Sequence, residues 1–225
     1  MRDTGVEAAD PSSPAPSRVT CVVLAAGAST RMGRRNKLLQ LVDSVPMVVA
    51  VVQTALASRV DEVLVVTGED RDRVEACLSG LPVRLVWNPD HAQGISTSLR
   101  VGASALPSRT QACVVCLGDM PLVRPDHIDT LIGAFHTHRN DSDARHLNPG
   151  MIFVPTWQGQ RGNPVLWTVD LLPEVATLTA DAGARVLIAR HPGKVREVPV
   201  HAPGILDDVD TPEALQELIA LSDTP

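Results

Sequence analysis

VVLAAGASTRMGRRNK, residues 22–37, determines how the rest of the sequence can be read. An apolar strand at 21–25 runs into four small residues at 26–29, and a basic segment containing Arg31 and Lys37 follows. Small side chains let backbone N–H groups approach an anion, and the N-terminus of a following helix favours negative charge. Arg31 can form a bidentate pair with phosphate oxygens, and Lys37 offers a compact point charge. We therefore expect a phosphate-binding loop directly after the first strand.

The spacing of this loop excludes two common phosphate-binding motifs. A Walker loop requires G-x-x-x-x-G-K-[ST], whereas Gly27 and Gly33 are six residues apart and Lys37 comes four residues later. The dinucleotide fingerprint G-x-G-x-x-G is also absent.

Length and composition indicate one globular domain. The chain has 225 residues, 44% of them hydrophobic and 20% charged, which suits a single sizeable core. The net charge of −6 argues against a general nucleic-acid-binding protein, and no apolar run approaches the roughly 18 residues needed to cross a bilayer. Residues 1–18 are polar and rich in proline and serine, so we expect a disordered tail with no secretory signal, a domain at 19–225 and a cytoplasmic location.

The four cysteines do not suggest a disulfide framework. Cys113 and Cys116 form a C-x-x-C motif, but they lie in the apolar run ACVVCLGDMP, which is typical of a buried strand. Residues three apart on a strand point to opposite faces, which is poor geometry for a shared metal. We expect two core residues.

Strands and helices are predicted to alternate along the chain, which favours an α/β layered sheet with right-handed crossovers. The apolar periodicity places strands at 61–67, 81–87, 112–117, 151–156 and 195–200, and helices at 46–58, 70–78, 96–106, 125–135, 168–176 and 182–190. Asp70 and Asp181 are expected to cap two of these helices. The polar segment 136–150, with three histidines, is predicted to be a solvated loop.

The turn-rich segment NPDHAQGISTSLRVG, residues 88–102, leads into a helix. Gly94 would permit the close approach of a flat base, and ligands of open α/β sheets bind at the carboxyl edge of the strands. Ser96 fits two interpretations, a helix cap or a contact to the base.

Asp119 follows a buried strand and is flanked by Gly118 and Pro121, which suits a metal-binding carboxylate. Mg²⁺ usually takes one or two protein carboxylates together with phosphates and water. The alternative is a cap for the helix near residue 125, although Asp126 is better placed for that role. Near the end of the chain, Asp210 is the candidate for a second ligand, and Thr211 is expected to cap the last helix.

Six motifs together cover nearly the whole chain from 19 to 218: LAAG-x-S-x-R-M-G-x-x-x-K, NPD-x-x-x-G-x-S-x-S-L-R, LGDMPLV, R-G-N-P-V, D-x-G-A-R and D-V-D-T-P-E. The sequence resembles the MobA-like nucleotidyltransferases, and within them the molybdenum cofactor cytidylyltransferases. The resemblance implies a single-domain, Rossmann-like mixed sheet, mostly parallel, and a Mg²⁺-dependent transfer of CMP from CTP to molybdopterin with release of pyrophosphate. The departure of segment 136–150 from the pattern leaves the acceptor contacts open.

The resemblance also assigns residues to roles. It implies nucleotide-binding positions at Leu24, Ala25, Ala26, Gly27, Lys37, Gly94 and Ser96. Catalytic positions are Arg31, Lys37 and Asp119, metal ligands are Asp119 and Asp210, and acceptor contacts are Arg161 and Asn163.

Alternative functions remain open at this point. Transfer of GMP to molybdopterin, or of a nucleotide to a sugar phosphate or phospholactate, uses the same chemistry, although the LAAG opening in place of LAGG favours cytidine by analogy. An NAD(P)H-dependent oxidoreductase of the nicotine blue type is a second class. A third is a non-catalytic chaperone that delivers cofactor to a molybdoenzyme, and such an enzyme or its chaperone is also a candidate partner.

Overall fold

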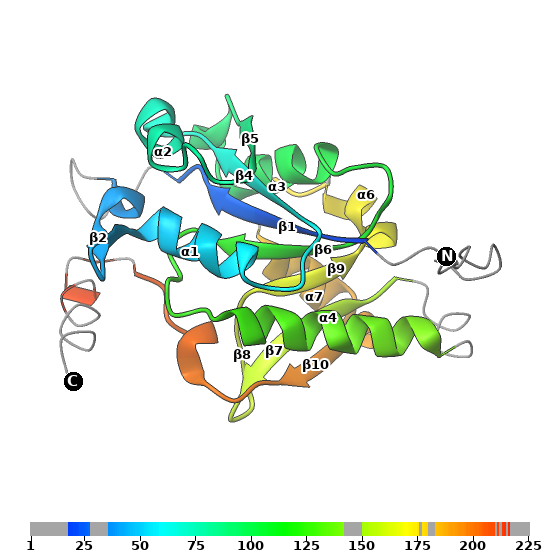
Figure 1. Ribbon diagram of the computed structural model, residues 1–225. Coiled ribbons are helices and arrows are strands. Elements are labelled where there is room, and N and C mark those ends of the chain that lie inside the picture. Colours follow the sequence, from blue (N-terminus) through cyan, green and yellow to red (C-terminus); the bar gives the residue numbers. More distant parts are fainter. Residues whose placement is uncertain are drawn as a thin grey trace, which may run out of the picture.

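The computed structural model describes residues 18–27, 36–141, 150–175, 177–179, 183–209, 211, 213, 214 and 216. Its centre is an eight-stranded mixed sheet in the order β10-β7-β9-β6-β1-β4-β5, with β8 paired to β7 (Figure 1). The strands are β1 Arg18–Ala25, β4 Glu62–Thr67, β5 Arg84–Trp87, β6 Thr110–Leu117, β7 Ile152–Trp157, β8 Gln160–Arg161, β9 Val165–Thr168 and β10 Val195–Pro199. A separate two-stranded ribbon joins β2 Leu41–Val42 and β3 Val45–Pro46.

Helices cover both faces of the sheet, which confirms the predicted α/β class (Figure 1). The helices are α1 Met47–Leu56, α2 Arg71–Cys77, α3 Ile95–Ser104, α4 Pro125–Asn140, α6 Leu172–Val175 and α7 Ala184–Arg190. Short 3₁₀ turns connect them: η2 Lys37–Leu39, η3 His91–Gln93, η4 Val169–Leu171, η5 Pro192–Lys194 and η6 Pro203–Ile205. One apolar core lies between the sheet and α1, α2 and α4, and a second lies between the sheet and α3, α6 and α7.

Strand residues alternate between these two cores, as the period of two requires. Cys113 belongs to the core on the α3 side, and Cys116 belongs to the core on the α1 side. The thiol of Cys116 lies 3.5 Å from that of Cys21 on the neighbouring strand, and both side chains are buried. The prediction that Cys113 and Cys116 are core residues on opposite faces of the sheet is confirmed, and burial raises the pKa of Cys113.

The central strands are parallel and end at the same edge of the sheet. β1 pairs with β4 and with β6 in parallel, and Leu24 is in register with Leu117. β5 is also parallel to β4, whereas β9 runs antiparallel to β6 and β7. The loops after β1, β4 and β6 therefore meet at one edge, where ligands of open α/β sheets bind.

The structure corrects the predicted end of the fourth helix. α4 continues to Asn140, so that His136 and His138 lie on a helix and not in a solvated loop. His138 is only 5% exposed and packs edge-on against Phe153, with 6.0 Å between the ring centroids. The buried face thus continues at helical spacing through Phe135 to His138, a pattern that the polar residues between them obscured.

Several predicted boundaries and caps also differ. Arg18, which was assigned to the tail, begins β1, and Thr168 ends β9, so that it does not open a helix. Asp70 precedes α2 with φ 50° and makes no capping hydrogen bond, and its carboxylate instead pairs with Arg73 at 3.5 Å. Gly183 occupies the position before α7, and Asp181 lies outside the described residues. The predicted cap at Thr211 is confirmed, because its hydroxyl accepts the N–H of Ala214 at 3.2 Å.

Among the described residues, no helix combines the length and the apolar character that a bilayer crossing needs.

The first turn of α4 contains a buried histidine. His127 is 1% exposed, and its Nδ1 accepts the backbone N–H of Arg124 at 3.3 Å. Burial lowers the pKa of His127, and the positive charge of Arg124 adds to this effect, whereas Asp126 opposes it. The folded protein therefore favours the neutral imidazole.

This histidine makes stability dependent on pH. Below the ordinary histidine pKa of about 6.5 the unfolded chain takes up a proton that folded His127 resists, so the free energy of unfolding falls as the pH decreases from there. Glutamine at this position can accept the same N–H without titrating. We expect His127→Gln to reduce the loss of stability between about pH 6.5 and 5, measured by urea unfolding. The exposed His201, changed to Gln, is the control, and an unchanged pH profile in His127→Gln would contradict the assignment.

Candidate functional site

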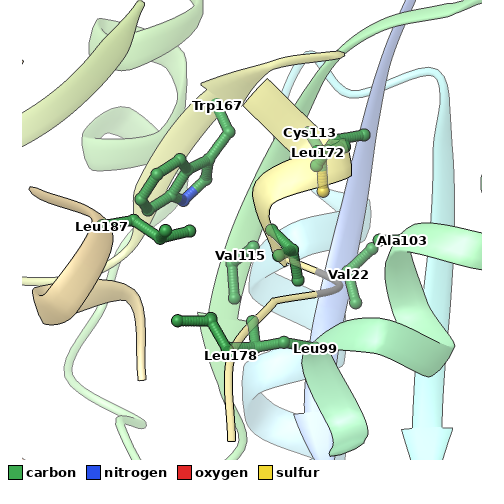
Figure 2. A pocket seen from close by; sticks show the side chains of 10 residues that line it. Val22, Leu99, Ala103, Cys113, Val115, Trp167, Leu172, Leu178 and Leu187 are labelled. Atoms are coloured by element: carbon green, nitrogen blue, oxygen red, sulfur yellow. The ribbon is translucent and has the colours of Figure 1, made fainter. Parts of the chain in front are cut away.

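Two of the hollows beside the sheet strands differ clearly in character. The first is a small cavity of about 20 Å³ within the α3-side core, with almost no polar surface (Figure 2). Its walls are Val22, Leu99, Ala103, Cys113, Val115, Trp167, Leu172, Val175, Leu178 and Leu187. A cavity of this size holds about one water molecule and offers no charged group, so it is a packing defect of the core.

The second hollow is a cleft of about 350 Å³ at the carboxyl edge of the sheet. It is lined by residues from the ends of β1 and β6, from η2 and η3, and from the start of α3: Leu24, Ala26, Gly27, Lys37, Leu38, His91, Ala92, Gly94, Ile95, Ser98, Leu117 and Asp119. Clefts of this volume accommodate small organic ligands. Leu24, Ala26, Gly27, Lys37, Gly94 and Asp119, all predicted as site residues, line it, and Ala25 lies buried on β1 beside it.

An ion pair joins the two charged groups of the cleft. Lys37 Nζ lies 2.6 Å from Asp119 Oδ2, and the two side chains are only 11% and 20% exposed. Lys37 opens η2, a turn that is fixed by the Asn36 side chain, whose Oδ1 accepts the N–H of Leu38 at 3.0 Å. Partial burial weakens solvent screening, so charges here act more strongly on a ligand than charges on the open surface.

The structure fixes the backbone around Asp119 from two sides. Gly118 N–H donates to the carbonyl of Leu24 at 2.9 Å, and Val209 N–H donates to the carbonyl of Asp119 at 2.9 Å. The second bond brings residue 209 of the C-terminal segment to the edge of the sheet. Asp210, the predicted second ligand, and Arg31 of the basic segment lie outside the described residues.

One oxygen of Asp119 suits a metal ion. Its Oδ1 is buried and finds no hydrogen-bond partner among the described residues, while Oδ2 pairs with Lys37. A buried carboxylate oxygen without a partner is costly, and a divalent cation would satisfy it. Within the described part of the chain no three metal-ligating side chains form a cluster. This arrangement fits a cation that takes few protein ligands and completes its shell from phosphates and water, as Mg²⁺ does.

The start of α3 brings Ser98 to the cleft, a residue that was not among the predicted site residues. Gly94, with φ 103°, precedes α3, so Ser96 lies within the first turn and does not cap the helix. Ser96 is fully buried and does not line the cleft, whereas Ser98 does. Positions i and i+4 share a helix face, so the spacing from Gly94 could have indicated Ser98 in place of Ser96.

Arg161 and Asn163 line a neighbouring hollow of about 300 Å³ together with Gly162 and Arg185. Arg161 is half exposed and pairs with Glu197 at 2.8 Å. The hollow lies on the α7 side of the sheet beside Val165, which is paired with Val115 near the end of β6. The start of α7 packs near α3, because a Cβ at Gly183 would lie 3.7 Å from the side chain of Ile95. The predicted acceptor residues therefore line a hollow that shares no lining residue with the cleft.

The close packing of Gly118, just after β6, against the backbone of β1 can be tested by substitution. A Cβ at Gly118 would lie 2.9 Å from the carbonyl oxygen of Leu24, a backbone atom that cannot move without disturbing β1. We expect Gly118→Ala to lower the free energy of unfolding by about 1–3 kcal/mol, measured by urea denaturation. Gly193→Ala is the matched control, because no atom lies within 4 Å of its added Cβ. Equal stability of the two variants would contradict the packing described for this edge.

Comparison with known proteins identifies relatives of the whole fold. The chain is 30% identical to the nicotine blue oxidoreductase of Paenarthrobacter nicotinovorans over 89% of this chain and 96% of the relative. It is 24% identical to the molybdenum cofactor cytidylyltransferase of Escherichia coli over 88% of this chain and 93% of the relative. The crystal structure of Rv0371c from Mycobacterium tuberculosis in complex with manganese is also similar, with a TM-score of 0.74, 26% identity, and coverage of 91% of this chain and 99% of that chain.

The family comparison agrees with these relatives. The MobA-like NTP transferase domain matches residues 21–195, a range that runs from β1 to the start of β10 and includes the cleft. The chain therefore belongs to the MobA-like NTP transferase family.

Proposed function

We propose that the protein transfers CMP from CTP to the terminal phosphate of molybdopterin in a Mg²⁺-dependent reaction that releases pyrophosphate. The observation that carries the proposal is the partly buried pair of Lys37 and Asp119 at the edge of a nucleotide-sized cleft. Membership of the MobA-like NTP transferase family and the cytidylyltransferase among the relatives support the same chemistry.

The charges of the reactants explain what the chain must supply. The acceptor phosphate attacks the α-phosphorus of CTP in line, the bond to the β-phosphate oxygen breaks, and pyrophosphate leaves with the bonding electrons. Both reactants are anions, so catalysis consists mainly of positioning and charge neutralisation. Lys37 lines the cleft and would neutralise oxygens of the triphosphate, and Arg31 is proposed to assist it. A general base is unnecessary, because a phosphate monoester is largely ionised near neutral pH.

Asp119 and Asp210 are the proposed ligands of the Mg²⁺ ion. The unpartnered Oδ1 of Asp119 supports the first assignment, and the bond from Val209 to Asp119 supports the second by bringing the C-terminal segment to the same edge. A bound Mg²⁺ would supply charge stabilisation to the phosphates and would hold them in a fixed orientation. The manganese in the complex of Rv0371c supports a divalent cation in this family.

The residues around the cleft also support separate places for nucleotide and acceptor. The backbone at 24–27 and at Gly94 is proposed to hold the nucleotide. Arg161 and Asn163, in the separate hollow beside Val165, are proposed to hold the anionic acceptor. The LAAG sequence at 24–27 supports CTP over GTP by analogy alone, and GTP is the first alternative to test.

An oxidoreductase is the second candidate function. The 30% identical nicotine blue oxidoreductase covers nearly the whole chain, so the scaffold is compatible with that class. In an oxidoreductase, however, the Lys37–Asp119 pair would have no role in phosphate transfer. Binding of NADPH together with failure to bind any nucleoside triphosphate would favour it.

Charge removal at the cleft tests the proposed function. We expect Lys37→Ala and Asp119→Asn each to lower kcat/KM by about 100-fold or more, because each removes a charge that stabilises the transition state. The assay is pyrophosphate release from CTP, GTP, ATP and UTP with Mg²⁺ and a panel of phosphorylated acceptors that includes molybdopterin. Lys194→Ala is a matched control, because Lys194 precedes β10 at the opposite edge of the sheet. Near-normal rates in both cleft variants would refute the assignment.

A further inference from the structure

The loop that leads into α3 is held by a buried side chain that no prediction included. Asn88 is 0% exposed and follows β5, where its backbone N–H donates to the carbonyl of Thr67 at 2.8 Å. Its side chain makes three further hydrogen bonds, two of them to hydroxyl groups at the start of α3.

The geometry fixes the orientation of the Asn88 amide. The backbone N–H of Asp90 can only donate, and it lies 3.0 Å from Oδ1, so this atom is the oxygen. The other atom is therefore the NH₂ group, which donates to Thr97 Oγ1 at 2.8 Å and to Ser98 Oγ at 3.0 Å. Both hydroxyls must accept from Asn88, and each keeps one proton to donate elsewhere.

The two hydroxyl protons have different destinations. Thr97 Oγ1 lies 2.9 Å from the carbonyl of Gly94 and 3.1 Å from that of Asp90, so its proton remains within the loop. For Ser98 no acceptor is found among the described residues, and its side chain lines the cleft. Within the described part of the chain, the Ser98 proton is therefore left to donate to a molecule bound in the cleft.

We propose that Asn88 is a positioning residue that commits the Ser98 hydroxyl to donate a hydrogen bond into the cleft, to an acceptor atom of a nucleotide base. A ring carbonyl oxygen or an unprotonated ring nitrogen provides such an atom. The η3–α3 segment that carries Ser98 also lines the cleft with His91, Ala92, Gly94 and Ile95. None of these is an arginine or a lysine, so this wall suits a flat base better than a triphosphate. This inference rests on the proposed nucleotide-binding function.

Three variants test the inference by calorimetric titration of the full chain with CTP and Mg²⁺. Ser98→Ala removes the donor and is expected to weaken binding about tenfold, as expected for one hydrogen bond. Thr97→Val removes the other hydroxyl that Asn88 contacts, and it should lower the melting temperature without changing the affinity. Asn88→Asp is isosteric but can only accept when ionised, so the Ser98 proton turns toward it and affinity should fall by the same factor as in Ser98→Ala.

The double variant separates positioning from general support of the fold. The variant that carries both Asn88→Asp and Ser98→Ala should bind CTP no more weakly than either single variant, because each substitution removes the same hydrogen bond from Ser98. In turnover the effect should appear as a higher KM for the nucleotide at unchanged kcat. If the two losses multiply to about 100-fold, or if Ser98→Ala binds as the wild type does, the inference is overturned.

Two further outcomes keep this inference distinct from the proposed function. If wild-type protein binds none of CTP, GTP, ATP and UTP, the proposed function fails, and the inference fails with it. If it binds one of them and Ser98→Ala matches its affinity, only the inference fails. If Asn88→Asp does not fold, the affinities of Ser98→Ala and Thr97→Val for CTP decide the matter: weaker binding in Ser98→Ala alone supports the inference, and equal binding in the two variants overturns it.

Discussion

The parallel pairing of β1 with β6 is the constraint on which the site depends. It places the ends of both strands at one edge, so that Lys37, a short distance beyond β1, meets Asp119, directly after β6. The close contact of Gly118 with the carbonyl of Leu24 fixes this meeting point to the backbone. An ammonium and a carboxylate held in this way are partly shielded from water before any ligand arrives, which is the preorganisation that the proposed phosphate chemistry calls for.

Short-range sequence patterns predicted much of this arrangement. The apolar runs gave the central strands, and the period of two correctly separated Cys113 from Cys116 on opposite faces of the sheet. Asp119 was selected because it follows a buried strand and is flanked by Gly118 and Pro121, and the structure places it at the cleft. The helical end of α4 was missed, because its buried side includes His138, a residue type that also occurs in loops.

Features that depend on long-range contacts could not be predicted from the sequence. The antiparallel insertion of β9 between β6 and β7 follows from packing, and no local pattern marks it. The choice between Ser96 and Ser98 required the first residue of α3, because a shift of one or two positions changes which hydroxyl faces the cleft. The fold alone also does not determine the reaction, because one relative is named an oxidoreductase and another a cytidylyltransferase. Function on this scaffold therefore has to be argued from the side chains at the cleft.

A crystal structure of the protein with CTP and Mn²⁺, with the metal located by its anomalous scattering, tests the central claim most directly. The account predicts a metal peak at about 2 Å from a carboxylate oxygen of Asp119, with Asp210 in the same coordination shell and the triphosphate within reach of Lys37. A metal and triphosphate bound away from the carboxyl edge of β1 and β6, with the Lys37–Asp119 pair unchanged, would contradict it.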